Sequence, residues 1–405
     1  MKKIFFAVYC SLFFSISLSA QNGIDFSGVL ETNWALAAPW TDNESYAGRF
    51  LAGDTSFTGK VDAYYGNSSA FGQLSINYDS LESDIAFSLD ELWIDYTDSF
   101  WGIRIGRQKI VWGKSDGIDI TNVICPSDFS NLCSLIKGDS KLAVDAVCLS
   151  LNKNNFSSDF LWIPFFTPAL LPVSPEVLEK PEYAIWNSEY GIRCSFYLSA
   201  LDISLYGFYG WDDNPFLDYS LTYEVSGNYK RMGMAGIDAA LPVGPVVFRM
   251  ETAVFPLRHF QKKAETIITE KSISGTSTST SQHNEFSALA GIDWMPEGWT
   301  ITAQYYLDYV NGNLENIERE NSFSHGATVS LSKNLLHDTI EISFSGILEF
   351  DCFDSLLNPS IKYSLSDQIT LNAGAIIFLP GPQKEGSYGK YKDLSSFILN
   401  ARFSF

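Results

Sequence analysis

The chain ends in Ser396–Phe405, SFILNARFSF, a segment in which one face is entirely apolar. Phe397, Leu399, Ala401, Phe403 and Phe405 occupy every second position, and the residues between them are mostly polar. A period of two is typical of a β-strand with one face in apolar surroundings. A soluble protein gains nothing from showing Phe-Ser-Phe on an edge strand, because apolar edges promote aggregation. The segment therefore predicts a strand whose apolar face is covered.

The same period recurs along the whole chain beyond residue 21, in segments about the ~9–11 residues that a tilted strand needs to cross a bilayer. We expect eighteen strands, near residues 23–36, 50–66, 70–79, 84–97, 101–113, 142–152, 156–166, 188–200, 201–211, 219–241, 245–257, 285–295, 299–311, 324–333, 339–351, 357–365, 368–380 and 394–405. Sixteen is the main alternative, because some segments change phase. Ile85, Phe87 and Leu89 are odd-numbered, whereas Leu92 and Ile94 are even, which predicts a β-bulge near 90–91.

The connections between these segments alternate in length. One set is tight, as at 67–69, 152–155 and 242–244, and the other is mostly long and polar, as at 114–141 and 258–284. Outer-membrane barrels have short periplasmic turns at one rim and longer extracellular loops at the other, whereas a soluble sandwich has no reason to sort its loops. The sequence thus predicts an all-β fold, a transmembrane antiparallel β-barrel over residues 21–405.

The first twenty residues have the features of a secretory signal peptide. Lys2 and Lys3 precede the apolar run Ile4–Leu18, and small residues end the segment at Ala20. We therefore expect residues 1–20 to be removed and the protein to reach the outer membrane. There, Phe403 and Phe405 resemble the terminal signal that the barrel-assembly machinery recognises.

Composition excludes several other classes of protein. The 405 residues are 46% hydrophobic and 15% aromatic, which is too apolar for a disordered chain. With 47 acidic against 27 basic residues, the chain would repel nucleic acid. After residue 20, no stretch approaches the ~18 apolar residues of a spanning helix.

Four segments together carry a resemblance. They are 104–117 (RIGRQKIVWGKSDG), 122–128 (NVICPSD), 161–166 (LWIPFF, with Pro168 and Pro172 following) and 231–240. They are similar to an uncharacterised bacterial outer-membrane β-barrel family, a domain of unknown function, for which GRQ-x-x-x-WG-x-SDG is the most specific run. The resemblance implies a barrel in the outer membrane, porin-like, and hints at transport of hydrophobic compounds.

The residues that could carry catalysis form no recognisable pattern. His259, His283, His325 and His337 have neither metal-ligand spacing nor an evident Ser-His-Asp context, so we expect no catalytic residue, metal or cofactor. The mature chain has five cysteines, an odd number that prevents complete internal pairing. Cys125 and Cys133 share one loop and are either bridged or free.

The 114–141 connection is far longer than a usual hairpin loop and unusually apolar for a segment in water. We expect it to fold inward and narrow the pore, with Asp116, Asp119, Asp128 and Phe129 as constriction candidates. The alternative is packing on the outer rim.

The 160–175 segment, FLWIPFFTPALLPVSP, is the second apolar connection. Pro164 cannot donate to a ladder, so the strand should end or bulge there. Trp162, Phe165 and Phe166 fit either an aromatic girdle at the bilayer edge or an entrance for apolar solutes.

Charged residues opposite the apolar faces should line the lumen. The lumen candidates are Arg104, Arg193, Arg249, Glu251, Asp308, Glu341 and Glu349. An excess of acidic groups in the lumen would favour cations over anions.

These patterns favour a passive outer-membrane channel for small solutes, hydrophobic ones included, and not an enzyme. The alternatives are a surface adhesin or antigen barrel with a closed pore, and an outer-membrane hydrolase. The expected partners are outer-membrane lipid, the barrel-assembly machinery and a small-molecule solute. The sequence leaves the oligomeric state open.

Overall fold

A computed structural model describes residues 22–40, 47–130, 140–171, 177–222, 224–382 and 386–405. The expected signal peptide, 1–20, lies outside these ranges. The main sheet has eighteen strands: β1 (Asn22–Ala37), β2 (Phe50–Tyr65), β3 (Ser68–Asp79), β4 (Asp84–Thr97), β5 (Trp101–Gln108), β6 (Val144–Lys153), β7 (Phe156–Ile163), β9 (Glu189–Tyr197), β10 (Asp202–Trp211), β13 (Arg231–Val243), β14 (Val246–Gln261), β15 (Thr280–Trp294), β16 (Trp299–Val310), β17 (Phe323–Leu335), β18 (Ile340–Glu349), β19 (Ser355–Ser364), β20 (Ile369–Leu379) and β21 (Ser396–Ser404).

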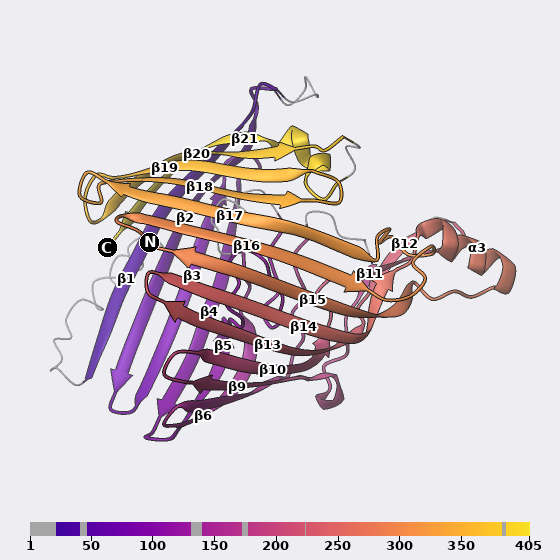
Figure 1. Cartoon of the computed structure of the whole chain (residues 1–405), viewed down its shortest axis with the longest axis horizontal. Helices are drawn as coiled ribbons and strands as arrows, with labels where there is room; N and C mark the ends of the chain where they lie inside the picture. Colours follow the sequence, from indigo (N-terminus) through magenta and orange to yellow (C-terminus); the bar gives the residue numbers. More distant parts are fainter. Residues whose placement is uncertain (1–21, 41–46, 131–139, 172–176, 223, 383–385) are drawn as a thin grey trace, which may run out of the picture.

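The sheet closes on itself (Figure 1). Each strand pairs antiparallel with its neighbours along the chain, and β1 also pairs with β21, so that Leu30 lies between Phe57 and Phe403. The predicted barrel of eighteen strands is confirmed, and the alternative of sixteen is wrong.

The two faces of the barrel have opposite chemistry. On β14, Phe248, Met250 and Val254 are exposed to the outside, whereas Glu251 between them is fully buried. This is the inverse of a soluble protein, and it suits a barrel whose outer face is covered by lipid. Among the described residues, no helix is long and apolar enough to cross a membrane.

Short turns of two to four residues join strands at one end of the barrel, the turn end, and three of them have two residues. Gly66, Asn154 and Gly244 each begin such a turn with a positive φ of 53–60°. Tight hairpins need this backbone conformation because it matches the twist of the flanking strands, and Gly and Asn adopt it most easily. The predicted short turns lie at these places.

One predicted irregularity is present in the strands, and one strand is shorter than expected. The pairing of β3 with β4 moves from Gln73↔Glu91 to Leu74↔Leu89, so Asp90 is the bulged residue, as the phase change predicted. The strand expected over 101–113 ends at Gln108 instead. Gly106 has a φ of +132°, and any side chain there would collide with the carbonyl oxygen of Leu92.

The opposite end, the loop end, carries further structure (Figure 1). Strands β11 (Phe216–Tyr219) and β12 (Val225–Asn228) form a small sheet with β8 (Val177–Glu179), and the helix α3 (Ala264–Ser274) lies beside it. The single strand expected over 219–241 is therefore two strands, β12 and β13.

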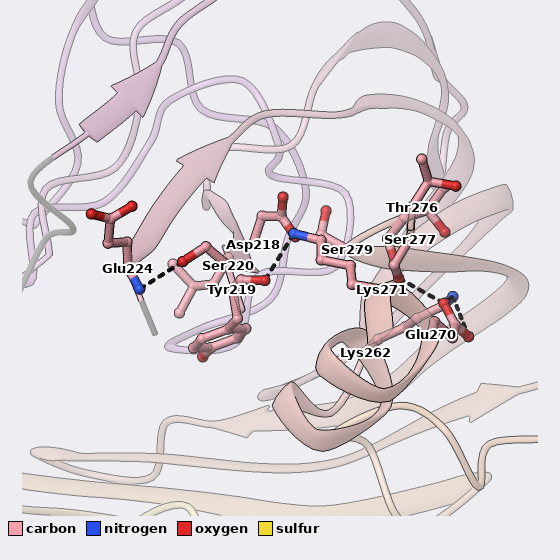
Figure 2. A network of polar contacts seen from close by, with 12 residues as sticks. Asp218, Tyr219, Ser220, Glu224, Lys262, Glu270, Lys271, Thr276, Ser277 and Ser279 are labelled. Atoms are coloured by element: carbon pink, nitrogen blue, oxygen red, sulfur yellow. Dashed lines mark hydrogen bonds and ion pairs between the residues drawn. The ribbon is translucent and has the colours of Figure 1, made fainter. Parts of the chain in front are cut away.

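One ion pair and one hydrogen bond from Lys271 fasten α3 to this small sheet (Figure 2). Lys271 donates to the Asp218 carboxylate at 2.7 Å and to the carbonyl oxygen of Tyr219 at 2.8 Å. Glu270, one residue earlier, accepts from Lys262 and from Ser277. The long loops are thus cross-linked to one another by side chains.

Candidate functional site

The chain leaves the barrel wall after β5 and enters the interior. Trp112, Ile120 and Ile124 are each less than 5% exposed. Trp112 packs on Tyr206 of β10 with ring centroids 5.2 Å apart. These side chains form one apolar cluster with inward-facing residues of the wall, including Phe208, Met232, Met234, Ala253, Phe255 and Leu289. We call residues 109–125 the inner segment.

Glu251 of β14 is the central anchor of the inner segment. Its carboxylate accepts hydrogen bonds from the backbone N–H groups of Lys114 at 2.9 Å, Ser115 at 3.0 Å and Thr121 at 2.7 Å. The Thr121 hydroxyl donates a fourth bond at 2.8 Å. A buried carboxylate is costly unless donors surround it, and bonds to an ionised group are stronger than neutral ones. The charge therefore fixes both ends of the turn 114–121 to the wall.

Gly113 allows this approach. Its φ is +83°, and a side chain would come within 2.8 Å of both Glu251 oxygens. The Trp-Gly pair in the sequence thus joins a buried ring to a backbone position that only Gly fills.

A buried polar network holds the inner segment from other sides. Lys114 pairs with Asp238 of β13 at 3.3 Å. Arg249 donates to the carbonyl oxygen of Lys114 at 2.9 Å and pairs with Asp293 of β15. The inner segment is therefore bonded directly to β13 and β14, and Asp293 of β15 holds the Arg249 side chain in place.

The tip of the inner segment, Asp116–Gly117, reaches farthest across the barrel. The Asp116 backbone exchanges two hydrogen bonds with the Gln304 amide of β16, at 3.1 and 2.7 Å. The tip borders a cavity of about 260 Å³ with Ser345 of β18 and Asn358 of β19. From β5 to this point the inner segment covers the inner face of the wall strands it crosses.

Two of the four constriction candidates, Asp119 and Phe129, line one cavity of about 290 Å³, and the other two are not among its lining residues. Asp116 is at the tip, and Asp119 pairs with Lys141 at 2.5 Å beside it in the interior. Asp128 instead forms a bridge with Leu170 of the next long loop, and its carboxylate accepts from Ser130. Phe129 follows it and is 44% exposed.

The lumen candidates all lie on the inner side of the wall. Arg104 pairs with Asp95 and Arg193 with Asp159, and all four line one cavity of about 360 Å³. Arg249 and Glu251 hold the inner segment. Asp308 lines a cavity together with Asp119. Glu341 pairs with Lys362 at 3.2 Å, and Glu349 lies beside Cys352.

Charge is distributed unequally around the lumen. Strands β1–β4 and β18–β21, which we call the open wall, carry eleven Asp or Glu and three Lys or Arg. Two acids are in β1, two in β2, one in β3, four in β4 and two in β18; the bases are Lys60, Lys362 and Arg402. All alternate with outward-facing apolar residues, so they face inward. Both neighbours at the bulge, Asp90 and Glu91, point into the lumen, where Gln73 donates to Asp90 and the Lys109 N–H to Glu91.

The aromatic candidates lie outside the lumen. Trp162 is on the outward face of β7, which ends at Ile163 as Pro164 predicted. Phe165 meets the ring of Tyr183 edge-on at 5.8 Å, and Phe166 packs on Tyr229 at 4.8 Å. A role as an entrance for apolar solutes stays a prediction.

Cys125 carries a free, buried thiol whose sulfur accepts from the Ile110 N–H at 3.2 Å. Burial raises the pKa of this thiol to about 11. Cys133 lies outside the described residues.

One cluster in the described part of the chain, Glu349, Cys352 and Asp354, has the ligand types of a metal site. Asp354 is fully buried, and its carboxylate accepts from the Cys352 thiol and from the N–H groups of Tyr388 and Gly389. These bonds fasten the 352–354 turn to the loop before β21.

Sequence reasoning missed Thr121 and Gly113 as parts of the site. The WG-x-SDG run contains the tip of the inner segment, so its density of Gly and Asp directly after a strand was the available signal. Alternation places Gln304 on the inward face, but it does not show what Gln304 binds. Nothing local in the sequence identifies this partner, because Asp116 is 188 residues away from Gln304.

Neither a protein-family model nor a curated protein matches this sequence. Solved structures do match. OccK3 (OpdO) of Pseudomonas aeruginosa has a TM-score of 0.56 at 8% identity, covering 94% of this chain and 95% of that one. OccAB3 of Acinetobacter baumannii has a TM-score of 0.55 at 8% identity, covering 94% and 99%. The outer membrane channel DcaP of Acinetobacter baumannii has a TM-score of 0.50 at 9% identity, covering 96% and 99%.

At this identity the similarity shows the fold, which is that of porin-like barrels. The chain has the fold of outer-membrane β-barrels, and the location of the turn end in the periplasm and of the loop end outside stays a prediction. The narrower family suggested by the GRQ-x-x-x-WG-x-SDG run stays a prediction.

Proposed function

We propose that the protein is a passive channel for small solutes, narrowed by the inner segment. The observation that carries this proposal is the anchoring of residues 114–121 to Glu251 inside the barrel. A barrel of eighteen strands is wide enough for an aqueous channel. A segment fixed against one side of the lumen narrows that channel and leaves a passage along the open wall.

The solutes that this passage favours are polar, and cationic or neutral. The open wall carries eleven carboxylates against three basic side chains, and low-dielectric walls amplify such fixed charge. The apolar side chains of the interior are buried under the inner segment, so hydrophobic cargo is the less favoured class.

The adhesin alternative has the cross-linked loop end in its favour. The small sheet β8–β11–β12 and α3 form an ordered surface outside the membrane. An adhesin with a closed pore would conduct no ions, whereas a channel would.

The hydrolase alternative has one contact in its favour. The Ser281 hydroxyl lies 3.0 Å from His283 Nε2, and His283 Nδ1 lies 2.9 Å from the carbonyl oxygen of Asn311. A nucleophile beside an oriented base is the geometry of acyl transfer. Five cavities of about 260–650 Å³ in the described part of the chain are lined by other residues than this pair, so we rank this function last.

Conductance in planar lipid bilayers tests the channel. We expect stable single-channel steps for the wild type, and larger steps when 118–137 are replaced by a short Gly-Ser link. The barrel should survive, because loop length costs little in closure entropy. Heat-modifiable gel mobility shows whether each variant is folded.

Folded protein without conductance would refute the channel and favour the closed adhesin barrel. Unchanged conductance after the deletion would place the constriction elsewhere. If wild-type protein hydrolyses lipid esters and Ser281→Ala does not, the hydrolase replaces the channel as the proposal.

A further inference from the structure

A short turn outside the barrel displays three large side chains that are mostly exposed. Tyr183, Ile185 and Trp186 are 82%, 68% and 73% exposed. The last two belong to the 3-10 turn η1 (Ile185–Asn187), directly before β9. We call residues 183–187 the aromatic turn.

The aromatic turn adjoins a row of aromatic residues on the lipid-facing wall. Trp162 of β7, Tyr190 of β9 and Tyr209 of β10 are paired in register and all face outward. They lie where these strands end toward the outside. Trp and Tyr gather at this level because their rings suit the boundary between lipid and water. The exposed patch of the aromatic turn is thus continuous with the lipid-facing surface.

The wall holds the aromatic turn rigidly. Arg231 donates to the carbonyl oxygens of Ser188 at 3.0 Å and Trp186 at 2.7 Å. Its guanidinium also stacks over the Trp211 ring, 4.1 Å from the centroid. The Trp211 indole N–H donates to the carbonyl oxygen of Asn187 at 2.9 Å. The exposure of the apolar side chains therefore reflects a fixed position.

The backbone of the aromatic turn needs little water. Asn187 N–H donates to Ala184, Ser188 N–H donates to Ile185, and the Asn187 amide donates to the carbonyl oxygen of Glu182. Together with Arg231 and Trp211, these bonds satisfy most of its polar groups. Backbone in a membrane must be satisfied internally, because lipid chains offer no partners.

We propose that the aromatic turn inserts into the outer leaflet of the membrane beside β9 and β10 and binds the acyl chains of its lipids. Continuity with the lipid-facing aromatic row selects lipid as the occupant. Ile273 provides the contrast: it is equally exposed, at 82%, but lies on α3 between Ser272 and Ser274. The insertion is independent of whether the barrel conducts.

Quenching of tryptophan fluorescence tests the insertion on the full chain in lipid vesicles. The chain has ten Trp, so the signal of Trp186 is the wild-type spectrum minus that of Trp186→Phe. Brominated phosphatidylcholine in the vesicles should quench this signal at least twofold, and aqueous iodide should leave it unchanged. Trp294→Phe gives the reference for a lipid-facing ring, since Trp294 lies on the outer face of β15.

A second variant tests the support of the aromatic turn. Arg231→Lys keeps the charge but loses the planar group that reaches two carbonyl oxygens, so quenching of Trp186 by bromolipid should fall by at least half. The gel mobility of the folded barrel should not change.

Two results would overturn the proposal. Quenching by iodide and not by bromolipid would place the aromatic turn in water. Protection from both quenchers, together with cross-linked dimers or trimers, would mean that a second copy of the chain covers it.

Discussion

At the scale of single residues, Glu251 connects the wall to the inner segment. Its fully buried carboxylate faces four donors, so its charge is compensated only while the segment is in place. In Glu251→Gln, the amide NH₂ would face N–H groups that need an acceptor. Leaving such donors unpaired costs about 1–3 kcal/mol each. We expect the inner segment to loosen, with noisier single-channel current and a larger mean conductance.

The matched control for this variant is Glu297→Gln, in the turn Pro296–Gly298 between β15 and β16. It removes the same charge from the same type of side chain and should leave the current trace unchanged. Equal noise in both variants would mean that Glu251 does not hold the constriction.

Cys125 gives a second prediction at this scale. Burial raises the pKa of its thiol to about 11, above the ordinary 9. The thiolate is the reactive form, so about one thiol in 10⁴ is reactive at pH 7. Alkylation by iodoacetamide, followed by peptide mass spectrometry, should be slow and should rise about tenfold per pH unit to near pH 11. Ser272→Cys on the exposed face of α3 is the control, and its rate should level off about two units lower. Rapid labelling of Cys125 at pH 7 would show that the inner segment opens.

The sequence identifies Glu251 as a lumen charge but cannot show its task. Local alternation shows that Glu251 lies on the inward face of its strand, because Met250 and Thr252 on either side of it belong to the outward face. Its partner Thr121 is 130 residues away, and no local pattern encodes which loop meets which strand. Likewise, no local pattern shows that Asp128 forms a bridge with Leu170 of the next long loop.

At the scale of elements, the strands were predictable because each must present an apolar face to lipid along its whole length. That requirement repeats in every strand, so even the bulge at Asp90 left a visible phase change. No such requirement acts on the loop end. Strands β8, β11 and β12 are three or four residues long, and β8 pairs with β12 across nearly fifty residues of chain. These short strands form because the loops contact one another, and such contacts leave no alternating pattern in the sequence.

Closure of the barrel by β1 and β21 carries a prediction of its own. Gly28 exchanges two backbone hydrogen bonds with Phe405, and the Phe405 ring covers the place where a Gly28 side chain would be. The ring also stacks on Phe57 at 6.4 Å. Gly28→Val should displace the ring and destabilise the closed barrel by about 1–3 kcal/mol, as overpacking does. The measurement is the temperature at which the folded gel band disappears.

Two further variants make this prediction specific. Gly23→Val is the control, because nothing lies within 4 Å of the position where its side chain would begin. Gly28→Val combined with Phe405→Ala should recover stability relative to Gly28→Val alone. Additive losses in the double variant would show that the ring does not meet residue 28.

At the scale of the whole molecule, the uneven charge of the lumen should govern which ions pass. The inner segment bonds to wall strands as far as β16, so in the proposed channel the passage would run beside the open wall and its eleven carboxylates. Charges act within about 8–10 Å at physiological salt, so only those beside the constriction should matter. Asp90 and Glu91 are inward-facing neighbours, and Glu91 contacts the start of the inner segment through Lys109.

We therefore expect a cation-selective channel whose selectivity depends on this pair. In Asp90→Asn with Glu91→Gln, both amides keep an accepting oxygen, so the bonds to Gln73 and Lys109 remain possible while two charges are lost. The permeability ratio of K⁺ to Cl⁻, from the reversal potential in a salt gradient, should fall about twofold or more, because low-dielectric walls amplify fixed charge. Asp116→Lys at the tip of the inner segment should also lower the permeability ratio of K⁺ to Cl⁻. Asp128→Asn, beyond the inner segment at the bridge to Leu170, should have no effect. If Asp128→Asn changed the ratio as much as the double variant, the open wall would not be the selective surface, and the passage would run past the 128–170 bridge.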